Sequence, residues 1–214
     1  MSSVWDERAE VYRQSEAHRE GADLDLVVEW ALGARTALDV ATGGGHVARR
    51  FREAGLEVTS CDPSPAMRPD VVCRAEELPF PDRSFDVAAC RLAAHHFEDV
   101  AVAVRELARV SRERVLVVDT LFAGEDEELA ERLRDPSHVR DYSETEWRAM
   151  LEEAGLRVEE VRVTDGSLAF DPWLERAGCK GDAAAQVREL LAGRMEGDRV
   201  RFERICLRAR REPA

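Results

Sequence analysis

The feature that most constrains the fold is a short apolar run that ends in a glycine turn and continues into a helix. Residues 36–40, Thr-Ala-Leu-Asp-Val, have the length of a buried strand, and Thr-Gly-Gly-Gly follows at 42–45. Residues 46–53 then have helical spacing, with Gly55 as a stop signal. Glycines let a backbone pass close to a ligand, and a helix start presents unpaired N–H groups there. Taken alone, the segment fits an ordinary glycine-rich turn as well as a ligand site.

The same alternation of strand and helix recurs along the next part of the chain. Strands are predicted at 57–61, 71–73, 85–90 and 115–119, with a helix at 100–110. Such alternation predicts parallel βαβ units, whose ligands lie beyond the carboxyl ends of the strands. Asp39, Asp62, Arg74 and Arg91 stand at or just after such ends, so we expect them to cluster.

Helices are also predicted on both sides of this core. Two of them lie between Val4 and Ala31, broken near Gly21. After Asp119 the pattern predicts helices at 125–134 and 144–154, the second capped by Ser143 with Glu146 in capping-box spacing. A strand at 156–163, helices at 172–177 and 183–191 and a strand at 200–209 complete the prediction.

Composition excludes several classes of partner. The net charge of -13 repels nucleic-acid backbones and anionic lipids, and in the arginine-rich segment 199–211 apolar residues alternate as in a strand. The five cysteines form no Cys-x-x-Cys pair, so neither a disulfide framework nor a metal site is expected. No signal segment or membrane span is seen, so we expect a cytoplasmic protein.

A second acid narrows the ligand of the glycine turn. Asp62 closes the next strand about 17 residues after Gly45, the offset at which a carboxylate grips ribose hydroxyls in nucleoside sites. Spacing cannot separate a dinucleotide such as NAD from S-adenosylmethionine (SAM). However, NAD places a pyrophosphate dianion against this turn, whereas SAM places a cationic sulfonium and an ammonium group there. Asp39 suits the cation and would repel the dianion.

Four segments together carry a family resemblance. They are Leu38 to Ala48, Cys-Asp-Pro-Ser-Pro-Ala-Met at 61–67, Ala-Glu-Glu-Leu-Pro-Phe-Pro-Asp-Arg-Ser-Phe-Asp at 75–86, and Arg-Leu-Ala-Ala-His-His-Phe at 91–97. With these segments the chain resembles class I SAM-dependent methyltransferases of the ubiquinone/menaquinone-biosynthesis type, and the resemblance extends through Asp-Pro-Ser-His-Val-Arg at 135–140.

The resemblance implies a role for each matching residue. The methionine portion of SAM would lie against Asp39, Thr42, Gly43 and Gly45, with the backbone of Arg91 near its ammonium group. Asp62 would hold the ribose hydroxyls. The adenine would pack beside Pro63 and Met67 and be contacted by the backbone of Ala75 and the side chain of Glu76.

The chain also departs from the family pattern. Ala41 replaces a glycine at the start of the turn, and Arg74 stands where an aspartate commonly contacts adenine. The segment between Asp62 and the next strand is too short for the usual helix, and the usual Lys-Pro-Gly-Gly turn before Val115 is missing. We therefore expect a trimmed fold with a more open adenine side.

Histidines supply the candidate catalytic groups. His95 and His96 follow the fourth strand, where the transferred methyl group would point, and His138 lies in a polar segment that would cover the substrate. A structural role for the pair at a helix start remains the alternative. Arg140 and Tyr142 are candidate substrate contacts, against an ordinary solvated loop. Tyr12 and His18 resemble positions that close over the cofactor, or they pack helices.

We therefore expect a Rossmann-like, doubly wound α/β fold with a mostly parallel seven-stranded sheet, N-terminal helices and a C-terminal helical and strand insertion. A single domain would comprise a helical cap at 1–34, a SAM-binding core at 35–120 and a substrate side at 121–214. The predicted activity is methyl transfer from SAM to a small molecule, with S-adenosylhomocysteine as product, by a monomer or homodimer. The alternatives are an NAD-dependent oxidoreductase and a non-catalytic SAM-binding protein.

Overall fold

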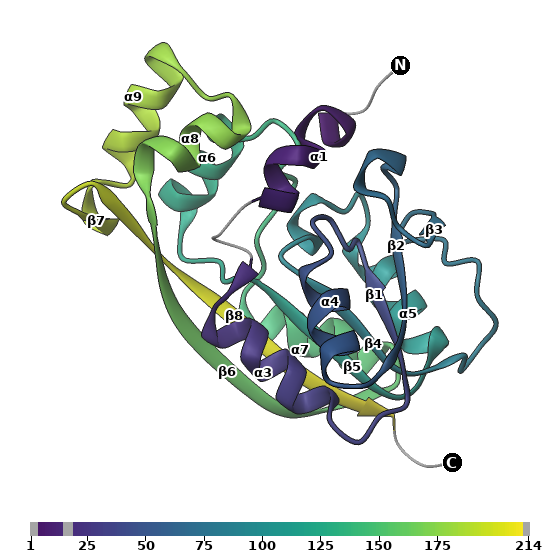
Figure 1. Ribbon diagram of the computed structural model, residues 1–214. Helices are drawn as coiled ribbons and strands as arrows, with labels where there is room; N and C mark the ends of the chain where they lie inside the picture. Colours follow the sequence, from purple (N-terminus) through teal and green to yellow (C-terminus); the bar gives the residue numbers. More distant parts are fainter. Residues whose placement is uncertain (1–3, 15–18, 212–214) are drawn as a thin grey trace.

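A single mixed sheet organises the chain, in the strand order β3-β2-β1-β4-β5-β8-β6. The structure, a computed structural model, describes residues 4–14 and 19–211 (Figure 1). Strands β1 to β5 are mutually parallel, and β8 runs antiparallel between β5 and β6. The strands are β1 Thr36–Val40, β2 Glu57–Asp62, β3 Val71–Val72, β4 Phe85–Arg91, β5 Ser111–Thr120, β6 Leu156–Ala169, β7 Met195–Glu196 and β8 Arg199–Arg211. The predicted doubly wound, mostly parallel fold is confirmed.

Helices cover both faces of this sheet (Figure 1). On one face, Leu24 of α3 and Phe51 of α4 are fully buried against the strands. On the other, Leu107 of α5 and Trp147 of α7 are buried in a second cluster. The helices are α1 Val4–Gln14, α3 Ala22–Ala31, α4 His46–Glu53, α5 Val100–Val110, α6 Glu125–Arg134, α7 Glu144–Glu153, α8 Phe170–Ala177 and α9 Gly181–Leu190, with short 3-10 turns η1 Pro65–Met67, η2 Ala94–His96 and η3 Ala192–Arg194.

Local signals placed several elements correctly. Helices α4 and α6 have the predicted bounds, and the predicted capping box of α7 is present. In that box the hydroxyl of Ser143 accepts the backbone N–H of Glu146, and the carboxylate of Glu146 accepts the N–H of Ser143 at 2.9 Å. The short connection after Asp62 holds only η1 and the two-residue β3, as expected from its length.

Other bounds differ because tertiary pairing extends the strands. Strand β6 continues to Ala169, well past the predicted end at Val163, because β8 pairs with it along its whole length. Strand β5 begins at Ser111, directly after α5, so no turn separates helix from strand. The short β7, which pairs with β8, was not predicted and adds to the seven strands of the sheet in the described part of the chain.

The extended β6–β8 hairpin carries a third cluster of buried side chains away from the main core. Phe170 and Trp173 of α8 pack there with Val187 of α9 and Ala130 of α6. Figure 1 shows these helices together at one end of the long strands, beyond the carboxyl ends of β4 and β5. Within the described residues, every helix is too short or too polar to cross a bilayer.

Candidate functional site

The carboxyl ends of β1, β2 and β4 open into a cavity of about 280 Å³, here named the cofactor cavity. All the predicted cofactor-binding residues except Gly45 line it, together with Trp5 of α1. Gly45 has a left-handed backbone conformation (φ +74°) and precedes the first residue of α4. The lining set is Trp5, Asp39, Ala41, Thr42, Gly43, Gly44, His46, Val47, Asp62, Pro63, Met67, Arg74, Ala75, Glu76, Arg91, Leu92, Ala93, His96, Phe97 and Glu98.

Asp39 and Asp62 hold the glycine turn in place. Asp39 accepts the hydroxyl of Thr42 at 2.5 Å and the N–H of Ala48 at 3.0 Å, both on Oδ2. Asp62 accepts the N–H of Gly43 and the N–H of Ser64, each at 2.9 Å. Burial raises the pKa of Asp39 to about 6 and also raises the pKa of Asp62. A cationic ligand beside these carboxylates would therefore favour their charged forms.

The two arginines of this cavity are paired with carboxylates. Arg91 donates from Nε to the buried carboxylate of Asp23 at 2.6 Å, which ties the end of β4 to α3, while its backbone remains at the strand end. Arg204 also pairs with Asp23, at 2.8 Å. Arg74 contacts Glu76 at 3.4 Å and Glu98 at 2.9 Å. One carboxylate oxygen of Glu76 accepts the N–H of Glu98 at 3.0 Å, so Glu76 also organises the loop before α5.

Helix α1 closes one side of the cofactor cavity. Asp6 accepts the hydroxyl of Ser64 at 2.5 Å, and Arg13 donates to the carbonyl of Ala66. Both partners belong to the segment around η1, which follows Asp62. Trp5 of the same helix packs edge-on against His96, with ring centroids 4.6 Å apart.

A second cavity, here named the acceptor cavity, adjoins the first. Leu92 and His96 line both, so these two residues form the boundary. The wall of the acceptor cavity includes His95, His138 and Asp141 on one side and residues of α6, α8, η3 and β8 on the other.

The histidines at the boundary differ in their charge. His95 pairs through Nδ1 with Asp119 at the end of β5, and its backbone N–H donates to the same carboxylate at 2.9 Å. Burial opposes protonation of His95, but Asp119 outweighs it and raises the pKa to about 9. His96 donates from Nδ1 to the carbonyl of Ser137 at 3.0 Å. Burial and the neighbouring charge of His95 hold the pKa of His96 well below its usual range.

Comparison with known proteins identifies the family. Residues 38–118 match the family described as "Methyltransferase domain". The chain is 38% identical over 204 residues to the methyltransferase YcgJ of Bacillus subtilis strain 168, a match that covers 84% of this chain and 80% of YcgJ. This chain belongs to the class I SAM-dependent methyltransferases.

Solved structures agree with this assignment. The methyltransferase resembles the crystal structure of Bacillus subtilis YcgJ with a TM-score of 0.80 and 29% identity, over 90% of this chain and 99% of that one. It resembles a protein of Bacillus halodurans C-125, described as a methyltransferase, with a TM-score of 0.82 and 29% identity, over 90% and 100% of the two chains. The predicted membership of the class I SAM-dependent methyltransferases is confirmed, whereas the ubiquinone/menaquinone-biosynthesis type stays a prediction. The NAD-dependent oxidoreductase alternative is rejected.

Not every predicted site residue of the methyltransferase lies at a cavity. Arg140 pairs with Glu146 and stacks over the ring of Tyr142 at 5.1 Å, and neither Arg140 nor Tyr142 lines the two cavities. Tyr142 packs instead against Trp147 of α7. The side chain of Tyr12 and all of His18 lie outside the described residues.

Other residues at or beside the two cavities carried no site signal in the sequence. Asp119 was predicted only as a strand end, and its pairing with His95 depends on the adjacency of β4 and β5. Trp5 was predicted only as part of the first N-terminal helix. Glu128 and Asp141, which contact each other and His138, carried no recognisable spacing signal.

Proposed function

We propose that this methyltransferase binds SAM in the cofactor cavity and methylates a small molecule held in the acceptor cavity. The observation that carries the proposal is the shared boundary, where Leu92 and His96 separate two cavities at the ends of adjacent strands. A methyl group on the cofactor side of this boundary would face an acceptor on the other side.

The cofactor cavity has the chemistry that SAM requires. Asp39 and Asp62 provide carboxylates for a cationic ammonium group and for ribose hydroxyls. Pro63, Met67 and Phe97 give the apolar surface on which an adenine would pack. These residues fit SAM better than a dinucleotide, because a pyrophosphate at this turn would face the buried Asp39.

The reaction needs little from the protein besides alignment and, for some acceptors, removal of a proton. When bound, SAM supplies a methyl group already activated by its sulfonium centre. The acceptor cavity would hold the nucleophile in line with that methyl group. His96 is the best-placed proton acceptor, because its Nδ1 donates to the carbonyl of Ser137 and Nε2 therefore carries no proton in the neutral ring.

His95 and His138 would have different parts in this site. His95 carries a positive charge beside Asp119 and would attract an acceptor with a developing negative charge. His138 is buried against Glu128 and is the candidate least suited to act on a substrate proton directly.

The residues that line the two cavities support separate roles for three parts of the chain. We propose that residues 1–34 form a cap, 35–120 the cofactor-binding core and 121–214 the acceptor side. In support, the cofactor cavity is lined by Trp5 of α1 and residues of the core, whereas α6, α8, η3 and β8 line most of the acceptor cavity.

The first test measures cofactor binding. We expect calorimetry to give one SAM per chain, and Asp62→Ala to weaken binding about 10- to 100-fold because charged hydrogen bonds to the ribose are lost. Asp70→Asn serves as the control, because Asp70 lies outside the cavity and accepts the backbone N–H of Ser60 on β2, the strand that ends at Asp62. Absence of any heat with SAM and with its demethylated product would overturn the proposal.

The second measurement tests catalysis and separates it from mere binding of SAM. Labelled methyl groups from SAM should enter the small-molecule fraction of a cell extract, and His96→Gln should lower this rate about 100-fold while SAM still binds. Label found only in macromolecules would contradict a small-molecule acceptor. Tight SAM binding with no transfer at all would favour the non-catalytic alternative.

A further inference from the structure

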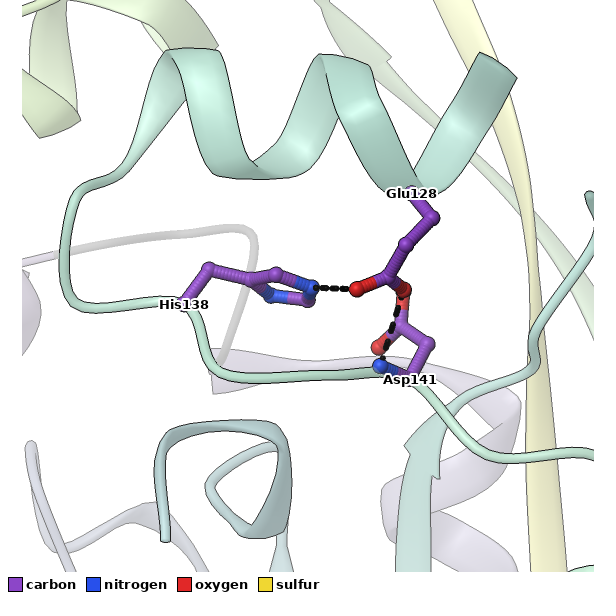
Figure 2. A group of neighbouring side chains, drawn as sticks. All are labelled: Glu128, His138 and Asp141. Atoms are coloured by element: carbon purple, nitrogen blue, oxygen red, sulfur yellow. Dashed lines mark hydrogen bonds and ion pairs between the residues drawn. The ribbon is translucent and has the colours of Figure 1, made fainter. Parts of the chain in front are cut away.

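Three buried polar side chains converge beside the acceptor cavity. Glu128 comes from α6, whereas His138 and Asp141 come from the segment that joins α6 to α7. Figure 2 shows the imidazole of His138 directed at the carboxylate of Glu128, with Asp141 below it. One nitrogen or oxygen atom from each residue lies within 4.8 Å of the other two.

This cluster is not satisfied by its own hydrogen bonds. Nε2 of His138 lies 3.2 Å from Oε1 of Glu128, and the backbone N–H of Asp141 donates to Oε2 of Glu128 at 3.0 Å. Among the described residues, however, Oδ1 of Asp141 and Nδ1 of His138 have no hydrogen-bond partner. Both side chains are more than nine-tenths buried, and an unmatched buried polar atom costs about 1–3 kcal/mol.

Two carboxylates this close together favour either a positive partner or protonation of one of them. Glu128 has a positive partner in Arg132, whose Nη2 lies 3.0 Å from Oε1, but the side chain of Arg132 is 54% exposed and reaches in from the surface of α6. Asp141 has no ion pair among the described residues. A cation between the three side chains would balance both carboxylates and use the unpartnered oxygen.

We propose that Glu128, His138 and Asp141 bind a divalent first-row transition-metal ion. Two carboxylates and one imidazole form a donor set suited to ions such as Mn²⁺, Fe²⁺ or Zn²⁺. Side-chain rotations would have to bring the ligand atoms, which lie within 4.8 Å of one another, to a common centre at the usual distances of about 2.0–2.2 Å. Arg132 would turn to solvent as the ion takes its place on Glu128.

The position of the site indicates what the ion would do, and this part rests on the proposed function. His138 and Asp141 line the acceptor cavity, so an ion held by three protein ligands would turn its open coordination positions toward that cavity. Those positions accept an oxygen of the acceptor, such as a hydroxyl, enol or carboxylate. A bound hydroxyl would lose its proton more readily, which would assist its methylation.

The competing explanation is purely structural. Glu128 could serve only to hold the segment 135–142 against α6 through its contacts with His138 and Asp141. In that case replacing Asp141 with the isosteric asparagine would leave the protein folded, and no ion would be bound before or after the change.

Binding of Mn²⁺ to the chelator-treated full-length chain tests the site. Mn²⁺ prefers oxygen donors, so the five cysteines of the chain do not compete for it. We expect the electron paramagnetic resonance signal of free Mn²⁺ to be lost up to one ion per chain. Binding should be at least about tenfold weaker in Asp141→Asn and His138→Asn. It should not change in Asp126→Asn, which alters an exposed carboxylate on α6, the helix that carries Glu128. Arg132→Gln should strengthen binding, because it removes the competing cation.

Variants of the two sites distinguish a failure of Mn²⁺ binding from a failure of SAM binding. Asp62→Ala should bind Mn²⁺ as the unaltered chain does, and Asp141→Asn should still bind SAM. Failure of all these chains to take up Mn²⁺ or Co²⁺ above the buffer background would overturn the metal site while leaving the cofactor proposal intact. Equal uptake by Asp141→Asn, His138→Asn and the unaltered chain would overturn it as well.

Discussion

Two residues of the cofactor cavity lower the stability of the fold: Ala41 through its backbone conformation and Asp39 through the burial of its carboxylate. Ala41, at the position where the family resemblance implies a glycine, has φ +54°, a left-handed conformation that costs an L-residue about 1–2 kcal/mol. The turn thus keeps its shape without that glycine, and the departure noted in the sequence does not remove the cavity. Asp39 is 1% exposed and is held by two hydrogen bonds to neutral groups.

Asp39 makes the ligand-free protein less stable as the pH rises. Its folded-state pKa, about 6, lies above the ordinary value of 3.8, so the folded chain binds this proton more tightly than the unfolded chain. Stability is therefore lost as the pH rises from about 4 to 6, up to about 3 kcal/mol. Asp39→Asn should raise the free energy of unfolding by about 2 kcal/mol at pH 7.5 and by little at pH 4.

Urea denaturation at both pH values checks this expectation. The same substitution should weaken SAM binding, because the carboxylate that faces the cation is gone. Equal effects of Asp39→Asn on stability at pH 7.5 and pH 4 would contradict the assigned titration. Asp25→Asn, an exposed carboxylate of α3, serves as the matched control.

Among the elements, α1 connects the two cavities. Arg8 donates to both carboxylate oxygens of Asp135, at 3.0 and 2.9 Å, and to the carbonyl of Ala177 at the end of α8. Asp135 is fully buried and also accepts the N–H and hydroxyl of Ser137. Burial opposes its ionisation, but these hydrogen bonds and Arg8 hold the pKa of Asp135 below its usual range. Through Arg8, the helix that carries Trp5 is tied to the acceptor side.

Removing this tie should loosen α1 from the rest of the chain. Arg8→Ala leaves the buried Asp135 without its cation, and we expect a loss of about 2 kcal/mol in the free energy of unfolding. SAM affinity should also fall several-fold, because α1 no longer closes the cofactor cavity. Chemical denaturation and calorimetry measure the two effects. Arg49→Ala, which removes an exposed pair with Glu53, should change both by little. Unaltered SAM affinity in Arg8→Ala would contradict the closing role of α1.

At the scale of the whole molecule, the long β6–β8 hairpin creates the acceptor side. Its extension past the core carries α8 and α9, which pack with α6 around Phe170 and Trp173. The acceptor cavity lies between this extension and the ends of β4 and β5. The cofactor cavity, by contrast, belongs to the parallel core and to α1.

This arrangement predicts an uneven response to the cofactor. SAM at 100 times its dissociation constant should stabilise the fold by about 2.7 kcal/mol and slow amide hydrogen exchange in α1 and η1. Amide exchange in α9 should change little, because no residue of α9 lines the cofactor cavity. Mass-spectrometric exchange measurements distinguish the two regions. Protection that is equal in α1 and α9 would contradict closure by α1.

The sequence by itself determined the elements whose signals are local. The glycine turn after β1, the bounds of α4 and α6 and the capping box of α7 depend on residues within a few positions of one another. The order of strand ends also placed Asp39 and Asp62 at one edge of the sheet, because parallel strands present their carboxyl ends together.

Only the tertiary structure decided which distant side chains meet. The pairing of His95 with Asp119 joins residues 24 positions apart, through the neighbouring strands β4 and β5. The contact of Glu128 with Asp141 needs the segment after α6 to fold back on that helix. Arg140 is exposed and does not face a cavity, because its side chain pairs with Glu146 of α7 and therefore depends on how that helix packs. Such contacts depend on how elements pack, and no local pattern of residues encodes that packing.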